Sequence, residues 1–220
     1  MNKQAMVLGL GQFGMAVARS LSARGVEVLA VDAEPERVEQ AAQFVAVARC
    51  FDATDERELT STAPKRRDVA VCAMGDESRE GSIICTALLK QLGAPRIVAR
   101  ATDPLHERIL LLVGAHEIVN PEYEFGMRLT TRLLYTGVLD EVPLGEDLLL
   151  TELQVPRSIV GRTLMQLALP KNFQVTVAAV RKKGGGAVVA PNPAEPLNAG
   201  DLLVLVSAPG AVVKMMERLR

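Results

Sequence analysis

The sequence lacks tryptophan altogether, and aromatic residues make up only 3% of its 220 residues. Aliphatic side chains must therefore fill any core, and a hydrophobic fraction of 49% is ample for one. An imbalance of charge is also missing, because 25 basic residues face 26 acidic ones. Without a basic excess, we expect no nucleic acid as a partner.

Long apolar runs and a cysteine framework are absent too. No stretch approaches the roughly 18 apolar residues that span a bilayer, and we expect no signal peptide before the first apolar run. Cys50, Cys72 and Cys85 are odd in number and irregularly spaced, which favours a reducing compartment. His106 and His116 belong to no cluster with zinc-ligand spacing. We expect a cytoplasmic protein without direct membrane insertion.

Short apolar runs alternate with helical patterns over the first 139 residues. The predicted strands are 5–10, 26–32, 45–49, 68–74, 96–101 and 117–120. The predicted helices are 13–24, 36–43, 55–61, 78–92, 104–113 and 124–139. Strict alternation indicates a parallel sheet with helices on both faces, so we predict an α/β fold with a Rossmann-like, doubly wound sheet.

The pattern changes after residue 139, and we divide the chain there into domains 1–139 and 140–220. Residues 145–147 end a short polar link. The predicted strands beyond it are 148–155, 175–181, 187–190 and 202–207, and the predicted helices are 159–169 and 211–220. A glycine-rich hairpin turn is predicted at 182–186. This mixture indicates a small α+β C-terminal domain.

One motif, Gly9-Leu10-Gly11-Gln12-Phe13-Gly14, follows the first predicted strand and opens the first predicted helix. Gly9 permits a tight turn, Gly11 lets a phosphate approach the backbone, and Gly14 lets the helix pack close to the strand. The helix N-terminus offers N–H groups and partial positive charge to the phosphates. The motif predicts a nucleotide site, and a glycine-rich turn that binds nothing is the alternative.

Asp32 ends the second predicted strand, 18 residues after Gly14. A carboxylate at this place accepts hydrogen bonds from ribose hydroxyls and repels a 2′-phosphate. NADP is therefore disfavoured, while NAD, ATP and ADP all remain open.

Hydride transfer would require an acid–base group beside the nicotinamide and a pocket closed by a second domain. Residues 146–220 contain no histidine, tyrosine or cysteine, and we expect structural or exposed places for His106 and His116. We predict that the chain binds a nucleotide and is not an enzyme. The alternatives are a stand-alone NAD-binding redox sensor, a minimal NAD-dependent oxidoreductase and a non-binding scaffold for assembly.

Several segments, in this order, resemble the regulator-of-potassium-conductance (RCK) family, and above all its cytosolic Trk/Ktr-type potassium-uptake subunits. They are the glycine motif, the strand that ends at Asp32, Asp52-Ala53-Thr54-Asp55, Asn120-Pro121-Glu122, Ser158-Ile159-Val160-Gly161-Arg162-Thr163-Leu164, and Pro191 with Gly200-Asp201-Leu202-Leu203-Val204. The resemblance covers essentially the whole chain and implies a nucleotide-sensing subunit that gates a membrane potassium channel or transporter.

The resemblance also implies site residues. The nucleotide-binding set is Gly9, Gly11, Gln12, Phe13, Gly14, Asp32, Asp52, Ala53, Thr54, Ala73, Met74, Gly75 and Arg100. Glu122 matches an acid near the phosphates or near a divalent cation. Plain structural roles are the alternatives: Asp52 and Asp55 as caps of the third helix, Arg100 as an exposed strand end, and Glu122 as a first-turn acid.

The resemblance further implies a homo-oligomer, in which dimers assemble into an octameric ring bound to a membrane potassium-translocating subunit. Helix 123–139 is the element exchanged or packed between protomers. The implied cofactor is an adenine nucleotide (ATP or ADP) or NAD(H). Gln12 replaces a frequent arginine and Phe51 a frequent glycine, so the sequence leaves the preferred nucleotide open, as it does the ligand of the second domain.

Overall fold

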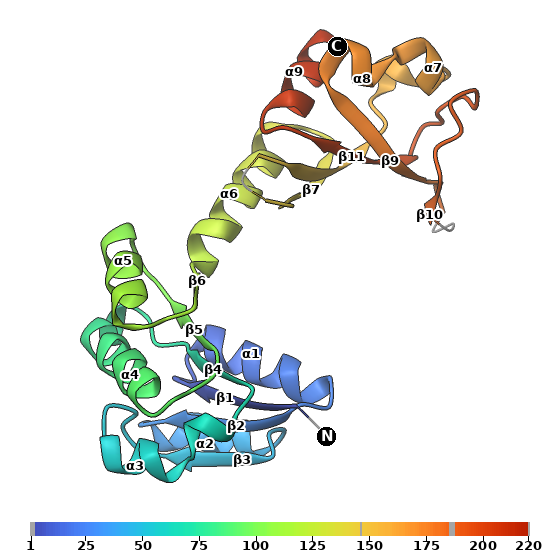
Figure 1. Cartoon of the computed structure of the whole chain (residues 1–220). Helices are drawn as coiled ribbons and strands as arrows, with labels where there is room; N and C mark the ends of the chain where they lie inside the picture. Colours follow the sequence, from blue (N-terminus) through green and yellow to red (C-terminus); the bar gives the residue numbers. More distant parts are fainter. Residues whose placement is uncertain (1–2, 146, 185–187, 220) are drawn as a thin grey trace. The chain divides into compact units, whose positions relative to one another are not determined.

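The computed structural model describes residues 3–145, 147–184 and 188–219, in two compact units that divide between Tyr123 and Glu124 (Figure 1). Each unit contains its own sheet. The predicted division after residue 139 lies further along the chain, because the helix that begins at Pro121 is grouped with the second unit over most of its length.

The first unit contains a six-stranded parallel sheet with the order β3-β2-β1-β4-β5-β6. Its strands are β1 (Gln4–Leu8), β2 (Glu27–Asp32), β3 (Val47–Cys50), β4 (Val69–Cys72), β5 (Ile97–Arg100) and β6 (Glu117–Val119). Its helices are α1 (Gln12–Ala23), α2 (Pro35–Ala42), α3 (Glu56–Ser61), α4 (Arg79–Gln91) and α5 (Pro104–Val113), with short 3₁₀ turns η1 (Pro64–Arg66) and η2 (Asp76–Ser78). The predicted doubly wound fold is confirmed.

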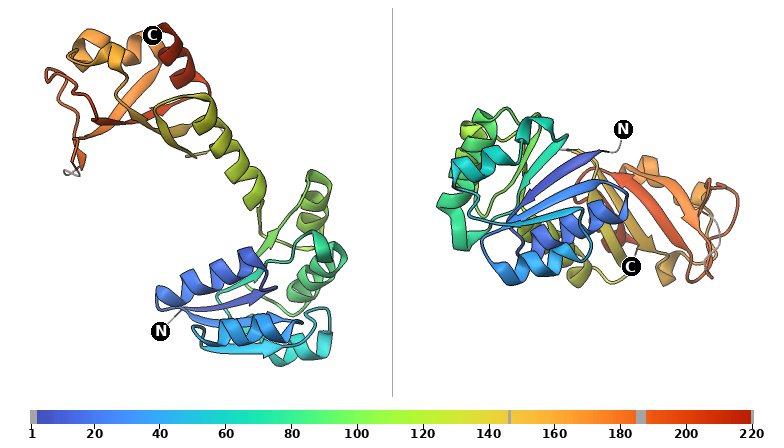
Figure 2. Two further views of the ribbon diagram at one scale, coloured as in Figure 1. Left: turned by 180° about the vertical axis from the view of Figure 1, so that it is seen from behind. Right: turned by 90° about the horizontal axis from the view of Figure 1, so that it is seen from below.

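Helices cover both faces of this sheet (Figure 2). Met6 and Leu8 of β1 pack in one core with residues of α3, α4 and α5, whereas Val7 packs on the other side with residues of α1 and α2. Because both faces are buried at the centre of the sheet, β1, β2 and β4 read as nearly continuous apolar runs in the sequence and not as alternating ones.

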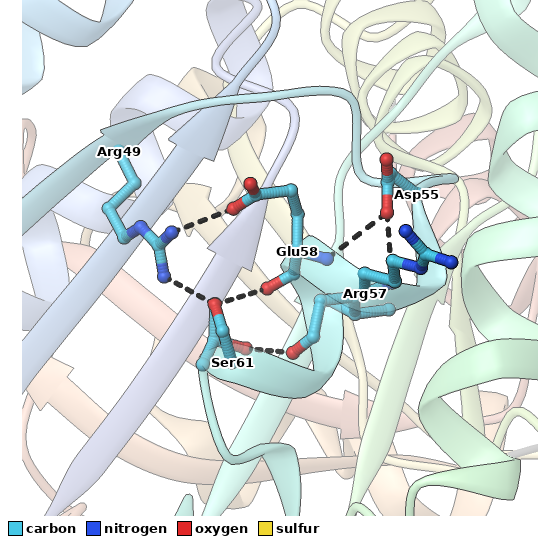
Figure 3. A network of polar contacts seen from close by, with 7 residues as sticks. Arg49, Asp55, Arg57, Glu58 and Ser61 are labelled. Carbon is cyan, nitrogen blue, oxygen red and sulfur yellow. Dashed lines mark hydrogen bonds and ion pairs between the residues drawn. The ribbon is translucent and has the colours of Figure 1, made fainter.

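Helix α3 is fastened at both of its ends (Figure 3). Asp55 caps it, and its Oδ1 accepts hydrogen bonds from the N–H groups of Arg57 (2.8 Å) and Glu58 (3.1 Å). Arg49 of β3 donates to Glu58 Oε2 at 2.8 Å and to Ser61 Oγ at 2.7 Å. These bonds tie α3 to β3 and so fix the loop between them.

The second unit contains an antiparallel sheet with the order β10-β9-β11-β8-β7. Its strands are β7 (Val138–Pro143), β8 (Leu149–Gln154), β9 (Val175–Arg181), β10 (Val188–Val189) and β11 (Leu202–Ser207). Its helices are α6 (Pro121–Leu134), α7 (Leu164–Leu167), α8 (Leu169–Phe173) and α9 (Ala211–Arg218), with a short turn η3 (Arg157–Ile159). This is the predicted small α+β unit.

Two predictions for this part of the chain are wrong in detail. Helix α6 ends at Leu134, because Gly137 takes a φ of +101° and Val138 then begins β7, which pairs with β8. The predicted helix 159–169 is mostly replaced by the short helix α7, because the backbone is extended at Val160 and Thr163 and left-handed at Ala168, with a φ of +44°. Parts of the polar link and of the predicted hairpin turn lie outside the described residues, namely residues 146 and 185–187.

Candidate functional site

The strand order reverses between β1 and β4, which is where parallel α/β sheets place their ligands. The carboxyl ends of the strands open there into a cavity of about 650 Å³. The lining includes every residue of the predicted site except Gly14 and Thr54. Those lining residues are Gly9, Gly11, Gln12, Phe13, Asp32, Asp52, Ala53, Ala73, Met74, Gly75, Arg100 and Glu122.

Two glycines of the loop are required by the fold itself. Gly9 has a φ of +90°, and a Cβ there would lie 3.1 Å from the backbone nitrogen of Met74 on β4's loop. A Cβ on Gly14 would lie only 1.9 Å from the carbonyl oxygen of Gly9. Gly14 therefore permits the close approach of α1 to the loop, although it does not line the cavity.

Gly11 differs from both of them. It precedes α1 with an unstrained φ of −62°, and no heavy atom in the described chain lies within 4 Å of where its Cβ would stand. The first turn of α1 contains no acidic residue and has no side-chain cap. Helix starts leave N–H groups unpaired, so bare backbone with donors borders open space here, as a phosphate site requires.

The carboxylate of Asp32 is held in place by the backbone. Only 7% of this residue is exposed. Its Oδ2 accepts a hydrogen bond from Leu10 N at 2.5 Å, and its Oδ1 accepts one from Glu34 N at 2.9 Å. Arg37 Nη1 lies 3.8 Å from Oδ2. Each carboxylate oxygen retains a further lone pair, so the group can accept hydrogen bonds from a ribose.

The segment after β3 shows how the predicted adenine-side residues lie. Asp52 and Ala53 line the cavity. Thr54 turns back instead, because its backbone N–H (2.9 Å) and its hydroxyl (2.8 Å) both donate to Asp52 Oδ1. Of the two aspartates considered as caps of α3, Asp55 takes that role.

Arg100 and Glu122 form an ion pair within the cavity lining. Arg100 is enclosed, with 17% of its side chain exposed, and its Cζ lies 5.8 Å from the centre of the Phe13 ring. On another side its Nη1 would lie 2.8 Å from a Cβ at Gly75. Its Nε is buried and has no hydrogen-bond partner in the described ranges. Arg100 is thus not a merely exposed strand end.

Part of the lining was not predicted from the sequence. Arg37 follows Asp32 by five residues, within α2, and the turn η2 after β4 contributes Asp76, Glu77 and Ser78. The short polar run directly after β4 was the available signal. The lining holds six carboxylates and two guanidinium groups; the acids are Asp32, Glu34, Asp52, Asp76, Glu77 and Glu122. This excess of negative charge favours a ligand that brings positive charge with it.

A complete metal site is not formed by the chain as far as it is described. No group of three or more histidine, cysteine, aspartate or glutamate side chains there could hold an ion. Oxygen ligands for a cation at Glu122 would have to come from a nucleotide or from a second chain.

The histidines make local bonds outside the cavity. His106 is buried, its Nε2 lies 2.8 Å from Ser82 Oγ, and its Nδ1 lies 3.2 Å from Thr102 Oγ1. Burial, reinforced by the nearby Arg79, lowers the pKa of His106. His116 Nδ1 accepts a hydrogen bond from Ile97 N at 2.9 Å. Neither ring lines the cavity.

The three cysteines are free thiols. Cys72 and Cys85 are completely buried in the core of the first unit. Cys50 is exposed at the end of β3, and its Sγ lies 3.5 Å from the carbonyl oxygen of Ala33, which lines the cavity.

Comparison with known proteins gives a family for each part of the chain. Residues 5–121 match the TrkA-N domain and residues 150–220 the TrkA-C domain. The Ktr system potassium uptake protein C of Bacillus subtilis is 31% identical over 99% of this chain and 98% of that protein. The Ktr system potassium uptake protein A of Vibrio alginolyticus is 34% identical over the same shares.

A solved structure of similar fold is the GsuK channel bound to NAD, with a TM-score of 0.66 and 16% identity. The match covers 100% of this chain and 40% of that one. No helix in the described ranges combines the length and apolarity needed to cross a bilayer. With both domains matched and full-length relatives above 30% identity, the chain belongs to the TrkA-N/TrkA-C family that includes the Ktr potassium uptake proteins.

Proposed function

We propose that this chain is a cytosolic, nucleotide-sensing regulatory subunit of a membrane potassium transporter. The observation that carries the proposal is the cavity at the strand-order reversal, with bare backbone at Gly11 and a fixed carboxylate at Asp32. The Ktr relatives, which this chain matches over nearly their whole length, are potassium uptake proteins. Binding itself is then the output, and no catalysed reaction is needed.

The ligand that the cavity fits is NAD(H) or an adenine nucleotide. The loop from Gly9 to Gly14 would hold the phosphates, Asp32 the ribose, and Asp52 with Ala53 the adenine side. Asp32 and Glu34 together oppose a 2′-phosphate, so NADP should bind worst. The GsuK channel, part of which has a similar fold, was solved bound to NAD, which supports this class of ligand.

The six carboxylates of the lining favour a ligand that carries positive charge or binds together with a cation. NAD⁺ carries a positive ring, whereas ATP and ADP bring only negative charge. We therefore propose that ATP or ADP binds together with a divalent cation, which Glu122 and the phosphate oxygens would share. Chelation of divalent ions should then weaken the binding of ATP much more than the binding of NAD⁺.

Helix α6 supports the proposed self-association. None of its residues is buried, and Tyr123, Phe125, Leu133 and Leu134 are each more than half exposed. Soluble monomers rarely leave so many large apolar side chains on one element. We propose that a second copy packs on α6 and that such dimers form the octameric ring. Light scattering should show smaller assemblies for Leu133→Asp and unchanged ones for Leu133→Met.

A thermal-shift comparison tests the ligand. ATP, ADP, NAD, NADH and NADPH are each added to the wild type, to Asp32→Ala and to the control Asp68→Ala, whose carboxylate lies outside the cavity and accepts from Gln4 N. Ligand at about 100 times its dissociation constant stabilises the folded state by ~2.7 kcal/mol. We expect this shift in the wild type and the control, and its loss in Asp32→Ala.

Other outcomes would point to the other functions. No shift with any nucleotide would reduce the function to assembly alone. Turnover of NADH with small carbonyl compounds would support the oxidoreductase. Potassium flux through the co-expressed membrane subunit, measured with and without nucleotide, tests the regulatory role, and we propose that residues 140–220 contribute to it as a separate regulatory domain.

A further inference from the structure

We propose that Glu122 opposes nucleotide binding by competing with a ligand phosphate for the guanidinium of Arg100. The inference rests on the nucleotide-binding function proposed above and assigns a mechanism to the same cavity. In this mechanism a phosphate displaces the Glu122 carboxylate from Arg100, and the displacement releases the start of α6 from β5.

The two partners of this ion pair differ in freedom. Arg100 is enclosed between the Phe13 ring and the backbone of Gly75, whereas 61% of the Glu122 side chain is exposed. The cation is therefore fixed at the end of β5, and the carboxylate can leave it for solvent. Exposed ion pairs contribute little to stability, so the fold does not depend on keeping this one.

A phosphate in the predicted place would reach the same cation. Phe13 is the second residue of α1, so Arg100 lies beside the helix start where phosphates are expected. A phosphate matches the planar fork of an arginine, and in both ADP and NAD it belongs to a pyrophosphate with at least two negative charges in total. It should therefore outcompete a single, solvated carboxylate, although every phosphate ligand must first overcome that carboxylate.

Two consequences separate this mechanism from a passive ion pair. The affinity for ligands without a phosphate, such as adenosine, should not depend on Glu122. When no divalent cation is present, ADP and NAD should bind more tightly without the Glu122 carboxylate. Glu122 is also the second residue of α6. Displacement frees the first turn of α6 from β5, and the same helix continues into the second unit.

Isothermal titration in EDTA tests the competition, because chelation removes any cation shared with Glu122. ADP, NAD and adenosine are titrated into wild type, Glu122→Gln, Arg100→Gln and the double variant. The control is Glu117→Gln, which breaks the exposed ion pair between Arg96 and Glu117 (2.6 Å). This pair lies at the amino-terminal ends of β5 and β6, outside the cavity.

We expect Glu122→Gln to lower the dissociation constant of ADP and NAD about two- to five-fold, the range of exposed ion pairs. Arg100→Gln should raise this dissociation constant roughly ten-fold. In the double variant, Glu122→Gln should cause no further change. The dissociation constant of adenosine should be the same in all variants, and Glu117→Gln should bind every ligand as the wild type does. Hydrogen exchange in the second turn of α6, whose N–H groups bond to the carbonyl groups of the first turn, should rise with ADP in the wild type.

Weaker or unchanged ADP binding by Glu122→Gln would overturn the competition, the first result indicating that Glu122 contacts the ligand directly. If the wild type bound neither ADP nor NAD, the nucleotide-binding function would itself fail, and the inference with it. The two failures are distinct, because only the second is seen in the wild type alone.

Discussion

Gly14→Ala should mainly lower the stability of the fold, whereas Gly11→Ala should mainly lower the affinity for the nucleotide. A Cβ on Gly14 would stand 1.9 Å from the Gly9 carbonyl oxygen and 3.0 Å from Ala73 Cβ. Ordinary close C···O contacts are about 3.3 Å, so α1 would have to retreat by roughly 1 Å or more. Overpacking of this kind costs about 1–3 kcal/mol, and we expect Gly14→Ala to lose that much stability.

Gly11→Ala introduces a methyl group that meets no described atom within 4 Å, at a φ that alanine adopts freely. Alanine is a poorer residue than glycine before a helix, which should cost less than ~1 kcal/mol. The methyl group would nevertheless stand where the phosphate approaches the backbone. We expect at least a roughly ten-fold loss of nucleotide affinity, or ~1.4 kcal/mol.

Urea unfolding and isothermal titration on both variants measure the two effects separately. Wild-type affinity in Gly11→Ala would mean that no phosphate lies against this loop, and the proposed ligand position would have to be abandoned. Wild-type stability in Gly14→Ala would show instead that α1 does not pack as closely on the loop as described.

Three further predictions concern stability. Because burial, with Arg79, lowers the pKa of His106, only the unfolded chain takes up a proton as the pH falls through its ordinary value near 6.5. The free energy of unfolding should therefore decline from pH 7 to pH 5, by up to ~1.4 kcal/mol per pH unit for this group, and His106→Gln should reduce the decline in urea titrations. Asp201→Ala removes an acceptor of two backbone N–H groups and a partner of Lys182; it should destabilise the second unit by about 1–3 kcal/mol, seen as faster hydrogen exchange in β11. Ala168→Gly relieves a left-handed φ of +44° and should stabilise that unit by up to ~1 kcal/mol, and an unchanged or lower melting temperature would contradict this.

The first unit was predictable because its central strands are buried on both faces. Strands β1, β2 and β4 are then short apolar runs, and β1, the glycine loop and α1 follow one another in the sequence as they do in space. The second unit was harder to predict, since its pieces are short. Val138 and Leu139 fit the apolar pattern of the preceding helix, and only the pairing of β7 with β8 shows that they form a strand.

The candidate site likewise contains residues that the sequence predicts and residues that it does not. Gly9, Gly11 and Asp32 could be identified because their spacing carries the chemistry. Arg37 and the acids of η2 were missed, because a polar run after a strand does not by itself show that its side chains face the same cavity. Thr54 shows the converse, since a hydrogen bond to its neighbour Asp52 turns it away. The identity of the nucleotide depends on contacts that the spacing does not specify, and it stays a proposal.

The burial of two cysteines and the exposure of the third give this protein a natural labelling site. Cys72 and Cys85 are shielded from solvent, whereas Cys50 stands at the rim of the cavity, beside Ala33. A maleimide dye added to the native, unmutated chain should therefore attach at one position. Its fluorescence would report events in the cavity, and labelling of the other two thiols would report that the first unit has opened.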